Sequence, residues 1–95
     1  MFVVKIHYQA SLAEVDKYVQ AHRDFLDLYY EQGVFLASGP MIPRTGGIIL
    51  AMGNDKEKLE AILAEDPYQQ AGLVTYEIIA FSPLKYRKEI KELIA

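Results

Sequence analysis

Hydrophobic and polar residues alternate along the first segment of the chain, residues 2–9. The even positions carry phenylalanine, valine, isoleucine and tyrosine, whereas Val3, Lys5 and His7 fall on the opposite side. This alternation and the β-branched residues predict a strand with one face toward a core. Three further apolar runs, each bounded by glycine, proline or asparagine, predict three more strands, at residues 34–38, 48–52 and 73–81.

A helical spacing follows the first strand and predicts one helix from Ser11 to about Gln32. Ser11 and Glu14 form a capping box, in which both side chains can satisfy backbone amides of the first turn. Gly33 would end the helix in the left-handed conformation. The residues expected to face the core recur every three or four positions: Leu12, Val15, Val19, His22, Leu26 and Tyr29.

A second helix is predicted after Asn54-Asp55, with its inward residues at Leu59, Ile62 and Leu63. It should stop at Asp66, because the residue before a proline is disfavoured in helical geometry. Residues 68–72 are expected to form a short connection. After Pro83, the spacing of its apolar residues predicts an amphipathic helix over residues 84–95.

The order of elements is therefore β-α-β-β-α-β with an added C-terminal helix. This order predicts an α+β fold of the ferredoxin-like kind, a four-stranded antiparallel sheet with both helices on one face. We expect one domain over residues 1–82 and a C-terminal helix over 83–95.

The second and third strands are apolar on both sides. Phe35 and Ala37 are expected on one face of the second strand, with Val34 and Leu36 on the other. Two helices cover only one face of a sheet, and monomers rarely expose a large apolar patch. The sequence thus predicts a homodimer, or a higher homo-oligomer, in which a second copy covers the open face.

Composition narrows the function classes. The chain has 95 residues with 52% hydrophobic and 24% charged, which is typical of one globular domain. Its net charge of −3, with scattered Lys and Arg, argues against nucleic acid as a partner. The absence of cysteine excludes disulfides, thiolate nucleophiles and Cys-ligated metals. Neither a signal peptide nor a membrane span is recognisable, so we expect a cytoplasmic protein without membrane contact.

His22 is the first candidate for chemistry. It lies on the inward side of the predicted helix, and an imidazole that titrates near neutral pH is the commonest general acid or base. The alternative is a core histidine whose ring nitrogens are satisfied by a backbone carbonyl and a tyrosine. The spacing alone does not decide between them.

Asp66 is the second candidate, on the inward side at the end of the second helix. A carboxylate there is disfavoured by the negative end of the helix dipole, which suggests a specific role. The alternative is a simple Asp-Pro turn stabilised by the side chain. If Asp66 and His22 meet, the carboxylate can fix the imidazole tautomer and raise its basicity.

Other candidates are weaker. A lone strand histidine such as His7 is more often at a surface or interface. No metal site is expected, because the histidines and carboxylates show no metal-binding spacing. Ser38 and Gly39, at the end of the second strand, could supply a hydroxyl or a backbone amide to a ligand. Gly46-Gly47 lacks the frame of a phosphate-binding loop and is expected to be a turn.

Together, several short segments resemble the YciI-like family over residues 1 to about 82: Ala21–Leu26, Leu36–Pro40, Gly46–Ile49, Glu65–Tyr68 and Ala71–Leu73. The resemblance implies a dimeric α+β barrel built from ferredoxin-like subunits. It also implies a catalytic histidine in the first helix and a catalytic aspartate before a proline, which match His22 and Asp66. Relatives with this barrel include muconolactone isomerase and enzymes acting on small hydroxylated or chlorinated aromatics.

Two functional hypotheses follow. The first is a cofactor-independent enzyme in which His22 is the general base or acid, Asp66 orients it, and the reaction on a small cyclic or aromatic metabolite is an isomerisation, an elimination such as dehalogenation, or a hydrolysis. Its pocket would be lined by Ser38, Gly39, Tyr8, Tyr29 and Tyr68. The second is a dimeric binding or stress-response module that holds a small metabolite without converting it.

Overall fold

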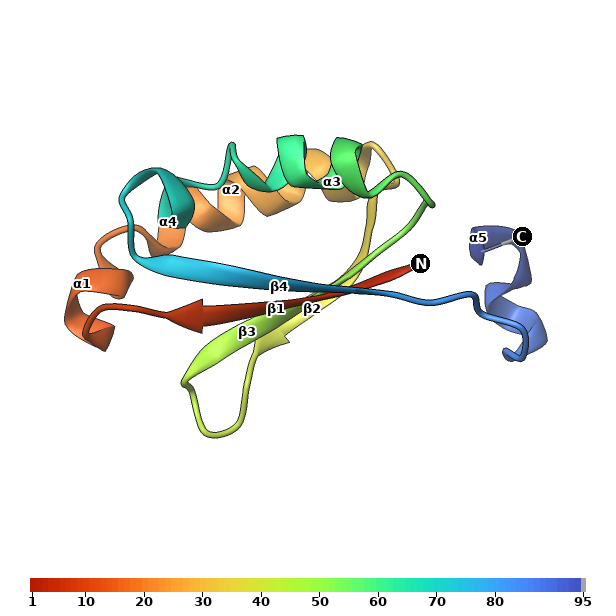
Figure 1. The fold of residues 1–95 in the computed structure, drawn as a ribbon, viewed down its shortest axis with the longest axis horizontal. Helices are drawn as coiled ribbons and strands as arrows, with labels where there is room; N and C mark the ends of the chain where they lie inside the picture. Colours follow the sequence, from red (N-terminus) through yellow and green to blue (C-terminus); the bar gives the residue numbers. More distant parts are fainter. Residues whose placement is uncertain (95) are drawn as a thin grey trace.

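A single antiparallel sheet with helices on one face forms the body of the protein. The computed structural model describes residues 1–94, and its strands are ordered β2-β3-β1-β4, all neighbours antiparallel (Figure 1). This confirms the predicted α+β, ferredoxin-like fold. The elements are β1 (Phe2–Tyr8), α1 (Leu12–Asp16), α2 (Val19–Glu31), β2 (Phe35–Pro40), β3 (Gly46–Ala51), α3 (Lys56–Leu63), α4 (Pro67–Gln70), β4 (Val74–Ala80), the 3-10 turn η1 (Lys88–Ile90) and α5 (Lys91–Ile94).

The core lies between the sheet and the helices. Phe2, Val4 and Ile6 of the central strand β1 are buried beneath them, as the alternation predicts. The helices contribute further buried residues to the same cluster, among them Val15, Phe25, Leu59, Ile62 and Leu63. Within residues 1–94, the opposite face of the sheet carries no helix (Figure 1).

The prediction of one long first helix is wrong. Tyr18, with φ −110° and ψ 4°, separates α1 from α2, and Leu12 is exposed rather than inward. An unbroken helix of this length would extend about 33 Å, whereas a seven-residue strand spans only about 23 Å. The break allows α1 to turn and bury Val15 at the end of the sheet.

The expected connection after Pro67 is a short helix, α4. Asp66 is its N-cap, and the fixed φ of Pro67 favours the first helical position. The dipeptide Asp-Pro therefore ends one helical segment and begins the next. Gly72, with φ +71°, follows the end of α4.

A bulge changes the faces of β2. Phe35 pairs with Ala51, but Ala37 pairs with Leu50, so one extra residue lies between them on β2. The expectation that Phe35 and Ala37 share a face is therefore wrong, since Phe35 is buried and Ala37 is exposed. β2 also continues through Pro40, which an edge strand tolerates.

The C-terminal segment extends beyond the sheet (Figure 1). Helical structure begins only at Lys88, later than predicted, and the predicted end at Ala95 lies outside the described residues. Leu84 is 85% exposed, so the apolar side of this segment lacks the packing that stabilises short helices. None of the helices within residues 1–94 has the length and apolarity to cross a membrane.

Gly46 provides a test of the sheet geometry. A Cβ at this position would collide with the carbonyl group of Ile6 on the neighbouring strand, whereas a Cβ at Gly39 would meet nothing within 4 Å. We expect Gly46→Ala to lower the free energy of unfolding by at least about 2 kcal/mol, and Gly39→Ala to change it by less than about 0.5 kcal/mol. Urea denaturation measures both. Equal stability of the two variants would contradict this packing.

Candidate functional site

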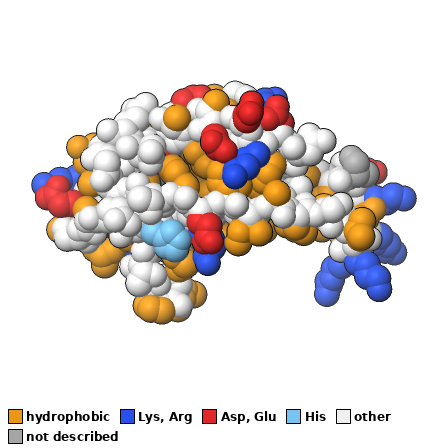
Figure 2. Space-filling view, viewed as in Figure 1, with side chains coloured by type: hydrophobic (Ala, Val, Ile, Leu, Met, Phe, Trp, Pro, Cys, Tyr) orange, Lys and Arg blue, Asp and Glu red, His pale blue; other side chains and the backbone are white. Residues whose placement is uncertain are grey.

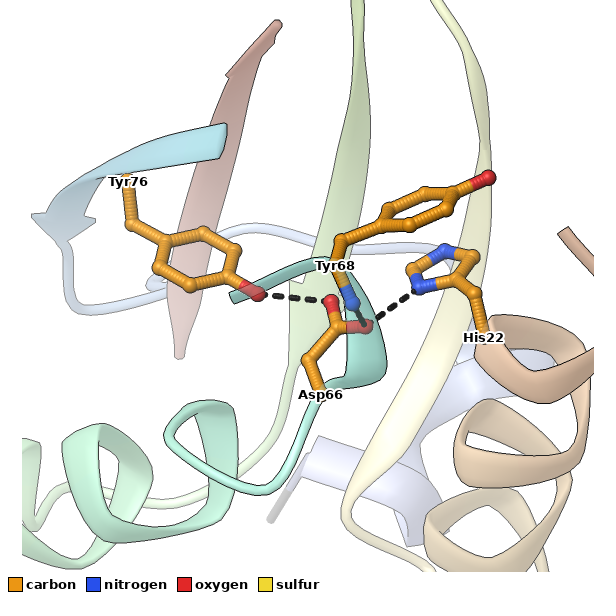
Figure 3. Close-up of polar contacts among 4 residues, drawn as sticks. All are labelled: His22, Asp66, Tyr68 and Tyr76. Carbon is orange, nitrogen blue, oxygen red and sulfur yellow. Dashed lines mark hydrogen bonds and ion pairs between the residues drawn. The ribbon is translucent and has the colours of Figure 1, made fainter. Parts of the chain in front are cut away.

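Asp66 is a fully buried carboxylate on which three donors converge (Figure 3). Its Oδ1 lies 2.8 Å from Nδ1 of His22 and accepts from the backbone N–H of Tyr68 at 3.0 Å. Its Oδ2 accepts from the hydroxyl of Tyr76 at 2.6 Å. The structure thus brings His22 and Asp66 together, and their chemical roles stay predictions.

Separate elements supply these groups. His22 comes from the second turn of α2, Tyr76 from the middle of β4, and Asp66 and Tyr68 from the start of α4. Asp66 makes the local turn that Asp-Pro sequences favour and also contacts His22, so the turn does not exclude the functional interpretation, which stays a prediction.

Aromatic rings fix the plane of the imidazole. The rings of His22 and Tyr68 are stacked, with centroids 4.0 Å apart and planes 11° from parallel. Tyr8 meets Tyr68 edge to face at 6.3 Å. Burial raises the pKa of Tyr68 to about 12 and also raises the pKa of Tyr76, assisted by the charge of Asp66. Both phenols therefore keep their protons at neutral pH.

The contact with Asp66 determines which nitrogen of His22 is available. A carboxylate without a proton only accepts hydrogen bonds, so beside this form of Asp66 a neutral imidazole donates from Nδ1 and carries its free electron pair on Nε2. The side chain of His22 is 13% exposed, and it borders a cavity. The imidazole can therefore exchange a proton with a molecule bound in that cavity.

The cavity has a volume of about 700 Å³ and lies between α2 and the sheet. Four of the predicted ligand-binding residues, Tyr8, Ser38, Gly39 and Tyr68, border it. Its other lining residues are Ile6, Asp16, Val19, His22, Arg23, Leu26, Asp27, Tyr30, Pro40, Arg44, Gly47, Ile48 and Ile49.

Tyr29, the fifth predicted ligand-binding residue, is not brought to the cavity. It lies in the core, and its hydroxyl donates to Glu65 at 2.7 Å, which raises the pKa of Tyr29. The next residue, Tyr30, borders the cavity instead, with its hydroxyl oxygen 2.6 Å from Oγ of Ser38. The periodicity of α2 finds inward residues, but Tyr30 lies at the margin of the inward face, where periodicity is least informative.

Arg44 is a second residue that sequence reasoning missed. It lies in the connection between β2 and β3, and its Nη2 donates to Oδ1 of Asp16 at 2.6 Å. Its guanidinium carbon is 5.6 Å from the centroid of the Tyr8 ring. The hydrogen bond to Arg44 lowers the pKa of Asp16. A single arginine in a loop has no periodicity or motif that marks it as a site residue.

The remaining candidates lie elsewhere. His7 is on the open face of the sheet, with Nε2 3.9 Å from a carboxylate oxygen of Glu77 and with 44% of its side chain exposed. Among residues 1–94, no three His, Asp or Glu side chains are grouped so as to hold a metal ion.

Comparisons with known proteins add to this geometry. Residues 1–82 match the family model described as YCII-related domain. One similar solved structure is 5-chloro-2-hydroxyhydroquinone dehydrochlorinase from Burkholderia phenoliruptrix AC1100 in complex with 2,5-dihydroxybenzoquinone. It has a TM-score of 0.73 and 16% sequence identity, covering 93% of this chain and 96% of that chain. At this identity the similarity shows the fold alone. No curated protein sequence matches the chain.

The hydrogen bond from Tyr76 to Asp66 predicts a specific dependence of stability on pH. The pKa of Tyr76 is raised in the folded state, whereas an unperturbed tyrosine, as in the unfolded chain, has a pKa of about 10. Below that pH both states hold the proton and the contribution to stability is complete. Above it the unfolded chain loses the proton first, so the contribution declines as the pH rises.

We therefore expect Tyr76→Phe to be less stable than wild type by about 1–3 kcal/mol at pH 7–9. The difference should narrow above about pH 10, by up to about 1.4 kcal/mol per pH unit. Urea denaturation between pH 7 and pH 11 measures it, with Tyr86→Phe in the exposed C-terminal segment as the control. A difference that stays constant up to pH 11 would contradict the role of this hydroxyl.

Proposed function

We propose that this chain, which belongs to the family of YCII-related domains, is an enzyme in which His22 transfers protons to and from a small hydroxylated ring compound. One observation carries the proposal: His22 is bonded to a buried carboxylate through one ring nitrogen and borders a cavity of about 700 Å³. A core histidine has no need of such a cavity.

The groups around His22 have separate roles in this proposal. Asp66 holds the tautomer in which Nε2 can accept a proton, and it stabilises the imidazolium that then forms. Tyr76 and the backbone N–H of Tyr68 hold the carboxylate in place. The stacked ring of Tyr68 keeps the imidazole from turning. In this arrangement the tautomer and the orientation of His22 suit general acid–base catalysis.

The lining of the cavity suits a planar ring with hydroxyl groups. Tyr8, Tyr30 and Tyr68 offer aromatic surface, and the paired hydroxyls of Tyr30 and Ser38 can donate to or accept from ring oxygens. The solved neighbour is named as a dehydrochlorinase of a chlorinated hydroxyhydroquinone, which supports the same substrate class here.

An elimination can proceed with these groups. Nε2 of His22 first takes the proton from a ring hydroxyl and returns it to the ring carbon that carries chlorine, which gives a ketone tautomer with chlorine on a tetrahedral carbon. Nε2 then takes the proton of a second, conjugated hydroxyl. The electron pair of that O–H bond forms a second carbonyl, and the electrons displaced through the ring expel chloride and leave a hydroxybenzoquinone. The proton and chloride leave as HCl in sum, so the reaction balances without a cofactor.

The test is release of chloride from 5-chloro-2-hydroxyhydroquinone under anaerobic conditions. We expect His22→Gln to lower kcat by about 10²- to 10⁴-fold and Asp66→Asn to lower it by about tenfold or more. Tyr29→Phe is the control, because its hydroxyl contacts Glu65 in the core and lies outside the cavity. Full activity of His22→Gln would contradict the mechanism. Binding of 2,5-dihydroxybenzoquinone without turnover of any chlorinated ring would favour a binding module.

We also propose that the chain forms a homodimer through the open face of its sheet. Paired residues of neighbouring strands share a face, and the registers place Val3, Ala37, Ile48, Leu50 and Ile79 on the side without helices. Figure 2 shows hydrophobic side chains along this lower side of the sheet. A two-fold dimer would bury this surface against its own copy.

Leu50→Lys is expected to convert this dimer into a monomer, because it places a charge in the middle of the apolar face. Leu28→Lys is the control, since Leu28 is an exposed residue of α2 on the helical side. Sedimentation velocity at micromolar concentration measures the mass of each variant. A wild-type chain that is monomeric under these conditions would overturn the proposal.

A further inference from the structure

We infer that Arg44 selects anionic substrates at this cavity, binding a carboxylate or an ionised hydroxyl on the ring, and that Asp16 occupies its guanidinium until the substrate arrives. The inference rests on the proposed function, because it concerns the same cavity. It adds the charge of the substrate and the residue that recognises it.

The position of Arg44 matches this role. It borders the cavity together with His22, and a row of aromatic rings connects the two residues. The guanidinium lies 5.6 Å from the Tyr8 ring, Tyr8 lies 6.3 Å from Tyr68, and Tyr68 is stacked on His22 at 4.0 Å. A planar substrate bound in the cavity would contact these rings, with an anionic group toward Arg44 and a hydroxyl toward Nε2 of His22.

The present partner of Arg44 is one that a substrate can displace. A guanidinium has five N–H donors and binds carboxylates best through two parallel hydrogen bonds. The contact with Asp16 joins Nη2 of Arg44 to Oδ1 of Asp16, at 2.6 Å. The two side chains are 34% and 52% exposed, and ion pairs that water reaches are weak. Replacing Asp16 with a better-placed anion therefore costs little free energy.

The charges around the cavity leave Arg44 as the cation best placed for this role. Two carboxylates, Asp16 and Asp27, and two guanidinium groups, Arg23 and Arg44, border the cavity, and the chain has a net charge of −3, so an anion that enters needs a positive charge beside it. Of the two arginines, Arg44 is the one that lies over the Tyr8 ring. Loss of a proton to His22 also adds negative charge to the ring oxygens. A fixed guanidinium stabilises that charge as it develops.

The substrates that fit are ring compounds with an ionised oxygen at neutral pH. Hydroxybenzoates carry a carboxylate, and hydroxyquinones are vinylogous acids whose negative charge spreads over two oxygens. Neutral phenols and amides of the same size lack this group. Arg44 would therefore discriminate by charge between molecules of nearly equal shape.

The experiment compares two probes, 4-hydroxybenzoate and its neutral amide, 4-hydroxybenzamide, in NMR titrations of the full chain. We expect wild type to bind the acid more tightly than the amide. Arg44→Gln should weaken binding of the acid by about tenfold or more and leave the amide within about twofold. Asp16→Asn should tighten binding of the acid by about two- to fivefold, because it removes the competing carboxylate. Arg87→Gln, in the C-terminal segment, is the control for the loss of one positive charge.

The opposite effects of the two variants separate recognition from structure. If the Arg44–Asp16 pair only stabilised the loop, both variants would weaken both probes, and this result would overturn the inference. Equal binding of acid and amide to wild type would overturn it as well, as would an effect of Arg23→Gln as large as that of Arg44→Gln.

These binding results are independent of turnover. Selection of the acid that depends on Arg44, without chloride release from any ring compound, would support Arg44 and overturn the proposed enzyme. Chloride release by wild type without preference for the acid would support the proposed enzyme and overturn the role of Arg44.

Discussion

The burial of Asp66 is the constraint on which the rest of this structure depends. A carboxylate removed from water is costly unless donors replace the lost solvent. Here the imidazole of His22, the hydroxyl of Tyr76 and the backbone N–H of Tyr68 do so, from α2, β4 and α4. Within residues 1–94, no buried side-chain nitrogen or oxygen lacks a partner. The same three hydrogen bonds therefore satisfy the charge and hold a helix, an edge strand and the α3–α4 connection in one arrangement.

This arrangement also determines which parts of the site are fixed and which can vary. His22 is held by Asp66 and Tyr68, which belong to the packed body of the domain. Arg44 also borders the cavity but comes from the connection between β2 and β3. Loops tolerate substitution far better than cores do. The group that we propose to transfer protons is thus part of the fold, whereas the recognition of substrate that we propose for Arg44 depends on a segment that can differ without disturbing the core.

The sequence predicts much of the fold and the central pair of the site, for reasons that particular residues illustrate. Alternation along β1 identifies its buried face because strand periodicity is strict. His22 and Asp66 are found from inward spacing, from Asp-Pro and from a family resemblance. The break at Tyr18 depends on the length of the sheet, and the bulge after Phe35 depends on pairing with β3, so local patterns report neither. Tyr30 and Arg44 are missed because their positions at the cavity arise from tertiary contacts.

The choice of a carboxylate behind His22 bears on the distinction between an enzyme and a binding module. A module that only holds a ring compound needs the imidazole as a neutral donor or acceptor, and a buried amide or carbonyl would orient it at lower cost. A carboxylate offers more than this only when the imidazole becomes positively charged. That happens when Nε2 takes a proton, and the stabilisation is then available at the moment of transfer, without reorganisation. The buried carboxylate behind His22 therefore supports the proposal of a reaction in which His22 changes its protonation state.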